Sequence, residues 1–153
     1  MTASGETLAR VQARSDRALA RAALAPGATF DEVVRAVERA VGIRLDVVAE
    51  TDTATWGTLT GFLAYFPERR EGTIHVRAGD ASLYREFAAS HELGHLLDDA
   101  HCSGAVHERS SVSPHRNPAL STSEIEAELV AEQVAHAIAR LMYAGPRVAE
   151  LSW

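Results

Sequence analysis

The chain has 153 residues, which is enough for one domain with a buried core and leaves little room for a second. Acidic residues outnumber basic ones by 21 to 15, and the resulting formal charge of −6 argues against a surface built to bind nucleic-acid phosphates. The lone cysteine, Cys102, excludes an internal disulfide, and no apolar run reaches the length of a signal peptide or a membrane span. We therefore expect a single cytoplasmic domain over residues 1–153, with no membrane partner and no direct nucleic-acid partner.

Two helices are predicted before the first strand. Residues 7–24, within the N-terminal segment 1–28, are rich in the strong helix formers Ala, Leu and Arg. Thr29 and Glu32 then have the spacing of a capping box, in which each side chain bonds the other's backbone at a helix start. Gly42 is the residue type that ends such a helix.

Three short strands are predicted next. Residues 43–49 alternate between apolar and polar side chains, which places Ile43, Leu45 and Val47 on one buried face. Residues 59–66 are apolar and contain Gly61, which predicts a bulge inside that strand. Residues 73–77 form the third strand, so we expect a small sheet of about three strands.

The remainder of the chain predicts two further helices around an irregular segment. One helix begins with a cap at Asp80 or Ser82 and continues to about residue 99. Residues 100–122 have no periodicity and are predicted to form a long irregular loop. The last helix is predicted over residues 123–143.

The most informative motif is the His-Glu-x-x-His pattern at residues 91–95. His91 and His95 are four residues apart, so on a helix both imidazoles lie on one face and can reach a single zinc ion. Glu92 follows the first histidine, where its carboxylate can take a proton from a metal-bound water whose pKa the metal has lowered. This chemistry is typical of zinc hydrolases.

A catalytic zinc site needs a third protein ligand, and the last predicted helix offers four glutamates. At about 100° per residue, Glu126 lies roughly 40° from Val130, at the edge of the apolar face. Glu128 and Glu132 point nearly opposite to that face. A carboxylate on the core side is costly unless it has a partner, and a metal ion would be one. We therefore predict Glu126 as the third metal ligand.

Helix capping leaves an alternative open for Glu126. If Ser123 is the N-cap, Glu126 occupies the position that completes a capping box and needs no metal. If Ser121 is the N-cap, Glu124 completes the capping box instead, and Glu126 remains available to a metal.

A second alternative is His101, which lies six residues after His95, as the third histidine does in longer zinc-protease motifs. Asp98 stands where that pattern has a glycine, which disfavours this assignment. Asp98 and Asp99 are expected to be surface charges, with support of a ligand histidine as the alternative. The other polar side chains of the predicted loop are expected to be solvated, although a loop histidine could move in to stabilise an oxyanion: Cys102, His107 and His115.

The order of these features resembles the ImmA/IrrE family of metallopeptidases. Residues 84–97 read Y-R-E-F-A-A-S-H-E-L-G-H-L-L, close to the family's typical R-x-F-x-x-A-H-E-L-G-H-L-L after a short sheet. The similarity covers residues 37–143. It implies an α+β, zincin-like fold: a small three-stranded mixed sheet packed against the His-Glu-x-x-His helix and a C-terminal helix that carries a glutamate ligand.

The resemblance implies a glutamate ligand in the last helix but offers two alignments for it. Residues 125–131 read I-E-A-E-L-V-A, close to the E-V-E-A-E-S-V-A of the related metallopeptidase domain in ArdC-type antirestriction proteins, and this alignment selects Glu126. The more usual form, E-x-x-A-N-x-F-A, matches Glu128, Ala131 and Ala135 instead, with Glu132 in place of the asparagine.

The resemblance also implies a function. Members of the family commonly cleave a helix-turn-helix repressor, so we expect a zinc endopeptidase that acts on a regulatory protein supplied in trans. One alternative is a non-catalytic, metal-dependent module that sequesters such a regulator. Another is an antirestriction or toxin function directed at nucleic acid, which the acidic charge balance disfavours.

Overall fold

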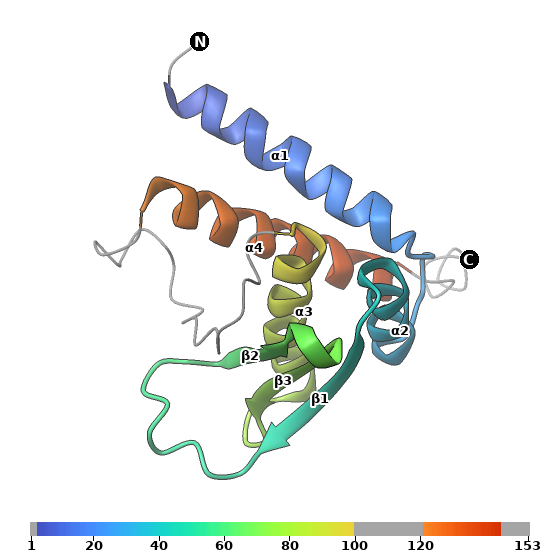
Figure 1. The fold of residues 1–153 in the computed structure, drawn as a ribbon, viewed down its shortest axis with the longest axis vertical. Coiled ribbons are helices and arrows are strands. Elements are labelled where there is room, and N and C mark those ends of the chain that lie inside the picture. Colours follow the sequence, from blue (N-terminus) through green and yellow to red (C-terminus); the bar gives the residue numbers. More distant parts are fainter. Residues whose placement is uncertain (1–2, 100–120, 145–153) are drawn as a thin grey trace, which may run out of the picture.

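The computed structural model describes residues 3–99 and 121–144 of the chain. Within them lie four α-helices and one mixed sheet of three strands, so the α+β class is confirmed (Figure 1). The elements in chain order are α1 (Ala3–Ala22), α2 (Phe30–Val41), β1 (Arg44–Glu50), β2 (Gly61–Phe66), the 3₁₀ turn η1 (Pro67–Arg69), β3 (Glu71–Arg77), α3 (Ser82–Leu97) and α4 (Thr122–Tyr143).

The two N-terminal helices form where the sequence predicts them, although α1 begins four residues earlier. Thr29 caps α2, and both hydrogen bonds of the predicted capping box with Glu32 are present. Gly42 ends α2 in the left-handed conformation, with φ of 71°, and its N–H donates to the carbonyl of Glu38. Glycine reaches this conformation without the strain of a side chain, which confirms it as the stop.

The sheet has the order β1-β3-β2, with β3 parallel to β1 and antiparallel to β2. The predicted bulge at Gly61 is wrong, because Gly61 pairs with Val76 in regular register. A close approach accounts for this glycine instead: a Cβ at position 61 would lie 3.0 Å from the carbonyl oxygen of His75 and 3.6 Å from the Cβ of Ala88 on α3.

The buried face of β1 is narrower than its alternating sequence predicts. Leu45 is completely buried, whereas Val47 is 36% exposed. β1 is an edge strand, and the hydrogen bonds that join it to α2 reach it at Leu45, near its start. The alternating pattern therefore predicts the strand correctly, but the helices cover only its first residues and leave Val47 partly exposed.

The helices stack on one side of the sheet in two layers. α3 packs against β2 and β3, α2 packs beside it, and α4 crosses α3 on the side away from the sheet, with α1 running along α4 (Figure 1). The hydrophobic core is continuous between these layers and includes Val37, Leu45, Ile74, Leu93, Leu97, Val130, Val134 and Ile138. None of the described helices is long and apolar enough to cross a membrane.

The last two helices begin differently, since only α4 has a side-chain cap. The predicted cap at Asp80 or Ser82 is wrong, because Ala81 occupies the N-cap of α3 and provides no side-chain hydrogen bond. At α4, Ser121 is the N-cap and forms a complete capping box with Glu124. Of the two capping alternatives, the structure therefore has the one that leaves Glu126 outside the cap.

Candidate metal centre

The two histidines of the His-Glu-x-x-His motif, His91 and His95, lie side by side in the buried part of α3. Residues 88–97 of α3 are all buried because the sheet covers one side of this helix and α4 covers the other. His91 and His95 sit one turn apart within this stretch, and their ring centroids are 4.9 Å apart. The helical spacing thus brings both imidazoles to one face, as the motif predicts.

The third member of the cluster is Glu128 on α4. Its Oε2 lies 2.9 Å from Nε2 of His91, and its Oε1 lies 3.1 Å from Nε2 of His95. All three side chains are buried, and one potential ligand atom from each lies within 4.8 Å of the others. These three residues therefore lie close enough to bind one metal ion.

The donor set fits a transition metal of the zinc type. Two imidazole nitrogens and one carboxylate oxygen form a common three-ligand set in catalytic zinc sites, which keep a fourth position open. Around a tetrahedral ion with bonds of about 2.0–2.1 Å, ligand atoms are separated by roughly 3.3 Å. The observed contacts of 2.9 and 3.1 Å are slightly shorter, so small outward movements would accommodate an ion.

The charges of the cluster shift the pKa values of its members. Burial lowers the pKa of His91, but the hydrogen bond to Glu128 and the charges of Glu92, Glu128 and Glu132 raise it by more, so the net shift is upward. Burial raises the pKa of Glu128, and the hydrogen bonds and charges of both histidines outweigh this and hold it far below its usual range. The contacts therefore favour the carboxylate form of Glu128 and shift His91 toward its protonated form.

Glu92 lies next to the cluster, as the motif predicts. Its side chain is almost completely buried, at 2% exposure, and its charge raises the pKa of His91. A buried carboxylate beside two imidazoles that lie close enough to bind a metal ion has the chemistry of a general base for a molecule bound there.

Glu126 does not lie with the histidines. Its Oε1 accepts a hydrogen bond of 2.7 Å from Arg10 on α1, and its Oε2 is 3.6 Å from Arg14. The hydrogen bond and charge of Arg10 outweigh the effect of burial and lower the pKa of Glu126. The structure thus differs from the predicted assignment of Glu126 as the third ligand. The Glu126 carboxylate does have a partner, but Arg10 and Arg14 of α1 provide it. Glu128 is the glutamate that faces the histidines.

The prediction of Glu126 as a ligand assumes one narrow apolar face on the last helix, and the structure has a wider one. α4 is buried against both α1 and α3, and at about 100° per residue its buried positions span roughly 200°. Glu126 and Glu128 lie at opposite edges of this wide face. The buried alanines at 127, 131 and 135 widen it toward Glu128.

Small residues allow α3 and α4 to approach closely beside the cluster. A Cβ at Gly94 would lie 2.9 Å from both the Cα and the carbonyl oxygen of Ala131, and 3.2 Å from the Cβ of Val134. No side chain fits at position 94 without moving a helix backbone. The spacing of Glu128, Ala131 and Ala135, which matched the more usual E-x-x-A form, is thus the signal that identifies the facing carboxylate.

The two aspartates at the end of α3 also have partners. The Asp98 side chain is only 5% exposed and binds Arg14 through two hydrogen bonds of 3.1 and 2.5 Å, so its expected role as a surface charge is wrong. Asp99 is exposed and pairs with Arg21 at 3.0 Å. A carboxylate at a helix C-terminus is unfavourable against the helix dipole, and Arg14 offsets this for Asp98.

The remaining candidates have separate positions. Glu124 belongs to the cap of α4, and Glu132 is about half exposed with His136 at 3.8 Å. Four side chains considered for ligation or oxyanion stabilisation lie outside the described residues: His101, Cys102, His107 and His115.

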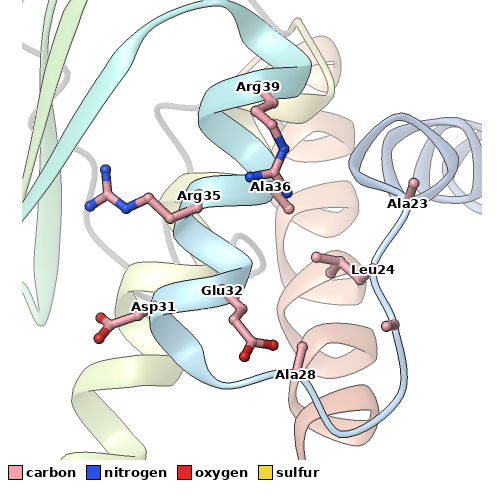
Figure 2. Close-up of a pocket in the computed structure, with 9 residues that line it drawn as sticks. Ala23, Leu24, Ala28, Asp31, Glu32, Arg35, Ala36 and Arg39 are labelled. Carbon is pink, nitrogen blue, oxygen red and sulfur yellow. The ribbon is translucent and has the colours of Figure 1, made fainter.

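A separate hollow of about 440 Å³ lies where the chain turns from α1 into α2 (Figure 2). Alanines line much of it, and Figure 2 shows Asp31, Glu32, Arg35 and Arg39 of α2 around it. Gly27 in this turn bonds Leu141 near the end of α4, about 20 Å along that helix from Glu128. The hollow is therefore not part of the metal centre.

Comparison of the chain with protein-family models, curated proteins and solved structures found no match.

Proposed function

We propose that this chain is a zinc-dependent endopeptidase with a zincin-like fold, consisting of one cytoplasmic domain. His91, His95 and Glu128 hold the ion, and Glu92 is the general base. The observation that carries the proposal is the buried cluster of two imidazoles and one carboxylate, joined by contacts of 2.9 and 3.1 Å, with a buried glutamate beside the first histidine.

When bound, zinc supplies Lewis-acid chemistry, which polarises a peptide carbonyl and acidifies a water molecule. The residues of the chain bind the ion and transfer protons. His91 and His95 contribute neutral nitrogens, and Glu128 contributes the negative charge that keeps a dication in a buried site. Glu92 takes a proton from the attacking water and passes it to the departing amine.

The substrate class rests on the sequence resemblance to ImmA/IrrE peptidases. We propose a regulatory protein of the helix-turn-helix repressor type, bound in trans. The formal charge of −6 supports a protein substrate over a nucleic acid, because an acidic chain repels a phosphate backbone.

The first test is metal analysis of protein purified without chelator. Wild type and Glu92→Gln should both carry about one equivalent of zinc, whereas Glu128→Gln should lose most of it because one ligand charge is removed. Glu126→Gln is the matched variant on the same helix: its side chain contacts Arg10 and Arg14 rather than the histidines, so it should still carry about one equivalent of zinc even where the affinity is lower. Zinc bound equally well by Glu128→Gln, or lost in Glu126→Gln alone, would contradict the ligand assignment.

The second test is cleavage of fluorescently labelled casein and of purified helix-turn-helix repressors, followed on gels. Wild type should yield fragments, and Glu92→Gln should yield none while it retains zinc. Fragments from Glu92→Gln at the wild-type rate would exclude its role as the base. Release of a repressor from its operator without any fragment would favour a binding module over a peptidase.

A further inference from the structure

The N-terminal helix α1 forms ion pairs with both α3 and α4, at positions close to the proposed metal ligands. Arg14 of α1 binds Asp98, which follows His95 by three residues at the end of α3. The same guanidinium lies 3.6 Å from Glu126, which precedes Glu128 by two residues on α4. One side chain therefore bridges the two helices whose ligands have to converge.

This bridge is more enclosed than an ordinary surface ion pair. The side chains of Arg14, Asp98 and Glu126 are 23%, 5% and 11% exposed. Arg10 adds a second contact to Glu126 at 2.7 Å from the same helix. A bidentate arginine–carboxylate pair with little solvent around it has a defined geometry, and it holds its partners more firmly than an exposed pair.

The position of the bridge suits control of ligand geometry. Glu126 and Glu128 point about 160° apart around α4, so fixing one fixes the rotation of the helix and hence the direction of the other. At roughly 6 Å from the helix axis, a rotation of about 10° would move the Glu128 carboxylate by about 1 Å. Metal–ligand distances tolerate only about 0.2 Å.

The close contact of Gly94 with Ala131 does not fix the rotation of α4. It sets how close α3 and α4 approach at their crossing. The bridge acts at the edge of α4 opposite Glu128, where it opposes rotation of the helix about its axis.

We propose that Arg14 is a positioning residue for the metal centre, and that docking of α1 is thereby coupled to metal affinity. This inference rests on the metal-binding part of the proposed function and does not require proteolysis. Because coupling is reciprocal, a bound metal also strengthens the docking of α1.

The test measures metal affinity of the full chain with zinc against the chromogenic chelator 4-(2-pyridylazo)resorcinol. Arg14→Gln should weaken zinc binding about tenfold, as supporting residues of metal sites typically do. Arg17→Gln is the matched control, because Arg17 is exposed on α1 and makes no ion pair or hydrogen bond with other described residues. Its affinity should equal that of wild type.

A second readout separates positioning from stability. With Co²⁺ as the probe, Arg14→Gln should change the visible absorption bands, which report ligand geometry, and Arg14→Lys should partly restore both spectrum and affinity. A lower melting temperature with unchanged affinity and unchanged spectrum would overturn the proposal, because it would make Arg14 merely structural.

If Arg14→Gln does not fold, more conservative substitutions of the same contact provide the test. Asp98→Asn should weaken zinc binding by a similar factor, and adding Arg14→Lys to it should cost little more, because both changes act on one contact. Fully additive losses would overturn the proposal. Wild-type protein that binds no metal would defeat the proposed function and this inference together, whereas zinc binding without cleavage would defeat only the peptidase.

Discussion

Replacing Gly94 with alanine tests whether the close crossing of α3 and α4 is a real constraint. The new methyl group would lie 2.9 Å from two backbone atoms of Ala131, well inside ordinary van der Waals contact. A flexible side chain could rotate away, but helix backbone cannot, so α4 has to move outward by about 0.5 Å to restore normal contact.

Two effects of opposite sign compete in this variant. Alanine is favoured over glycine inside a helix by about 1 kcal/mol, which alone would stabilise the protein. Overpacking of a core costs about 1–3 kcal/mol, and the upper end applies because backbone atoms are involved. We therefore expect a net loss of about 2 kcal/mol, equivalent to a fall in melting temperature of roughly 6 °C for a chain of this size.

The assay is urea unfolding of the metal-free protein followed by far-ultraviolet circular dichroism. Gly79→Ala is the control, because a Cβ at position 79 would meet nothing within 4 Å. Its stability should change by less than about 0.5 kcal/mol. If Gly94→Ala equals or exceeds wild type in stability, helix propensity dominates and the described crossing distance is wrong.

Two further predictions follow from the coupled histidine and from the cap of α4. The pKa of His91 is raised, so a proton on this imidazole competes with the metal. Zinc affinity should therefore fall as the pH drops, and the fall should begin above the ordinary histidine pKa of about 6.5. The measurement is a chelator titration from pH 8 to 5.5, and a constant affinity over this range would contradict the prediction. Loss of the cap in Ser121→Ala should cost about 1 kcal/mol in urea unfolding. Ser123→Ala, two residues further into the helix, should change stability by less than about 0.5 kcal/mol, and equal losses in the two variants would refute the assigned helix start.

The elements governed by local chemistry could be predicted from the sequence. Thr29, Glu32 and Gly42 define α2 through bonds that form within a few residues, and the His91–His95 spacing places both imidazoles on one face by helix geometry alone. Such features depend on a single turn of backbone, so the periodicity of the sequence contains the required information.

Features that depend on a distant partner could not be predicted in the same way. The choice between Glu126 and Glu128 depends on which helices cover the two edges of α4, and nothing within α4 identifies Arg10 or Arg14 as partners more than a hundred residues away. The burial of Asp98 and the regular pairing of Gly61 likewise depend on tertiary neighbours. The core-side carboxylate of Glu126 needs a partner, and only the fold shows that Arg10 and Arg14 provide it.

The distribution of the cluster along the chain determines when it can assemble during synthesis. Ribosomes release the chain from its N-terminus, so the sheet, α1 and both histidines emerge before α4. Glu128 follows His91 by 37 residues, and it meets the imidazoles only after α4 has packed onto α3. A nascent chain that already displays the complete His-Glu-x-x-His motif thus holds two of the three members, and the finished centre appears together with the last packed helix.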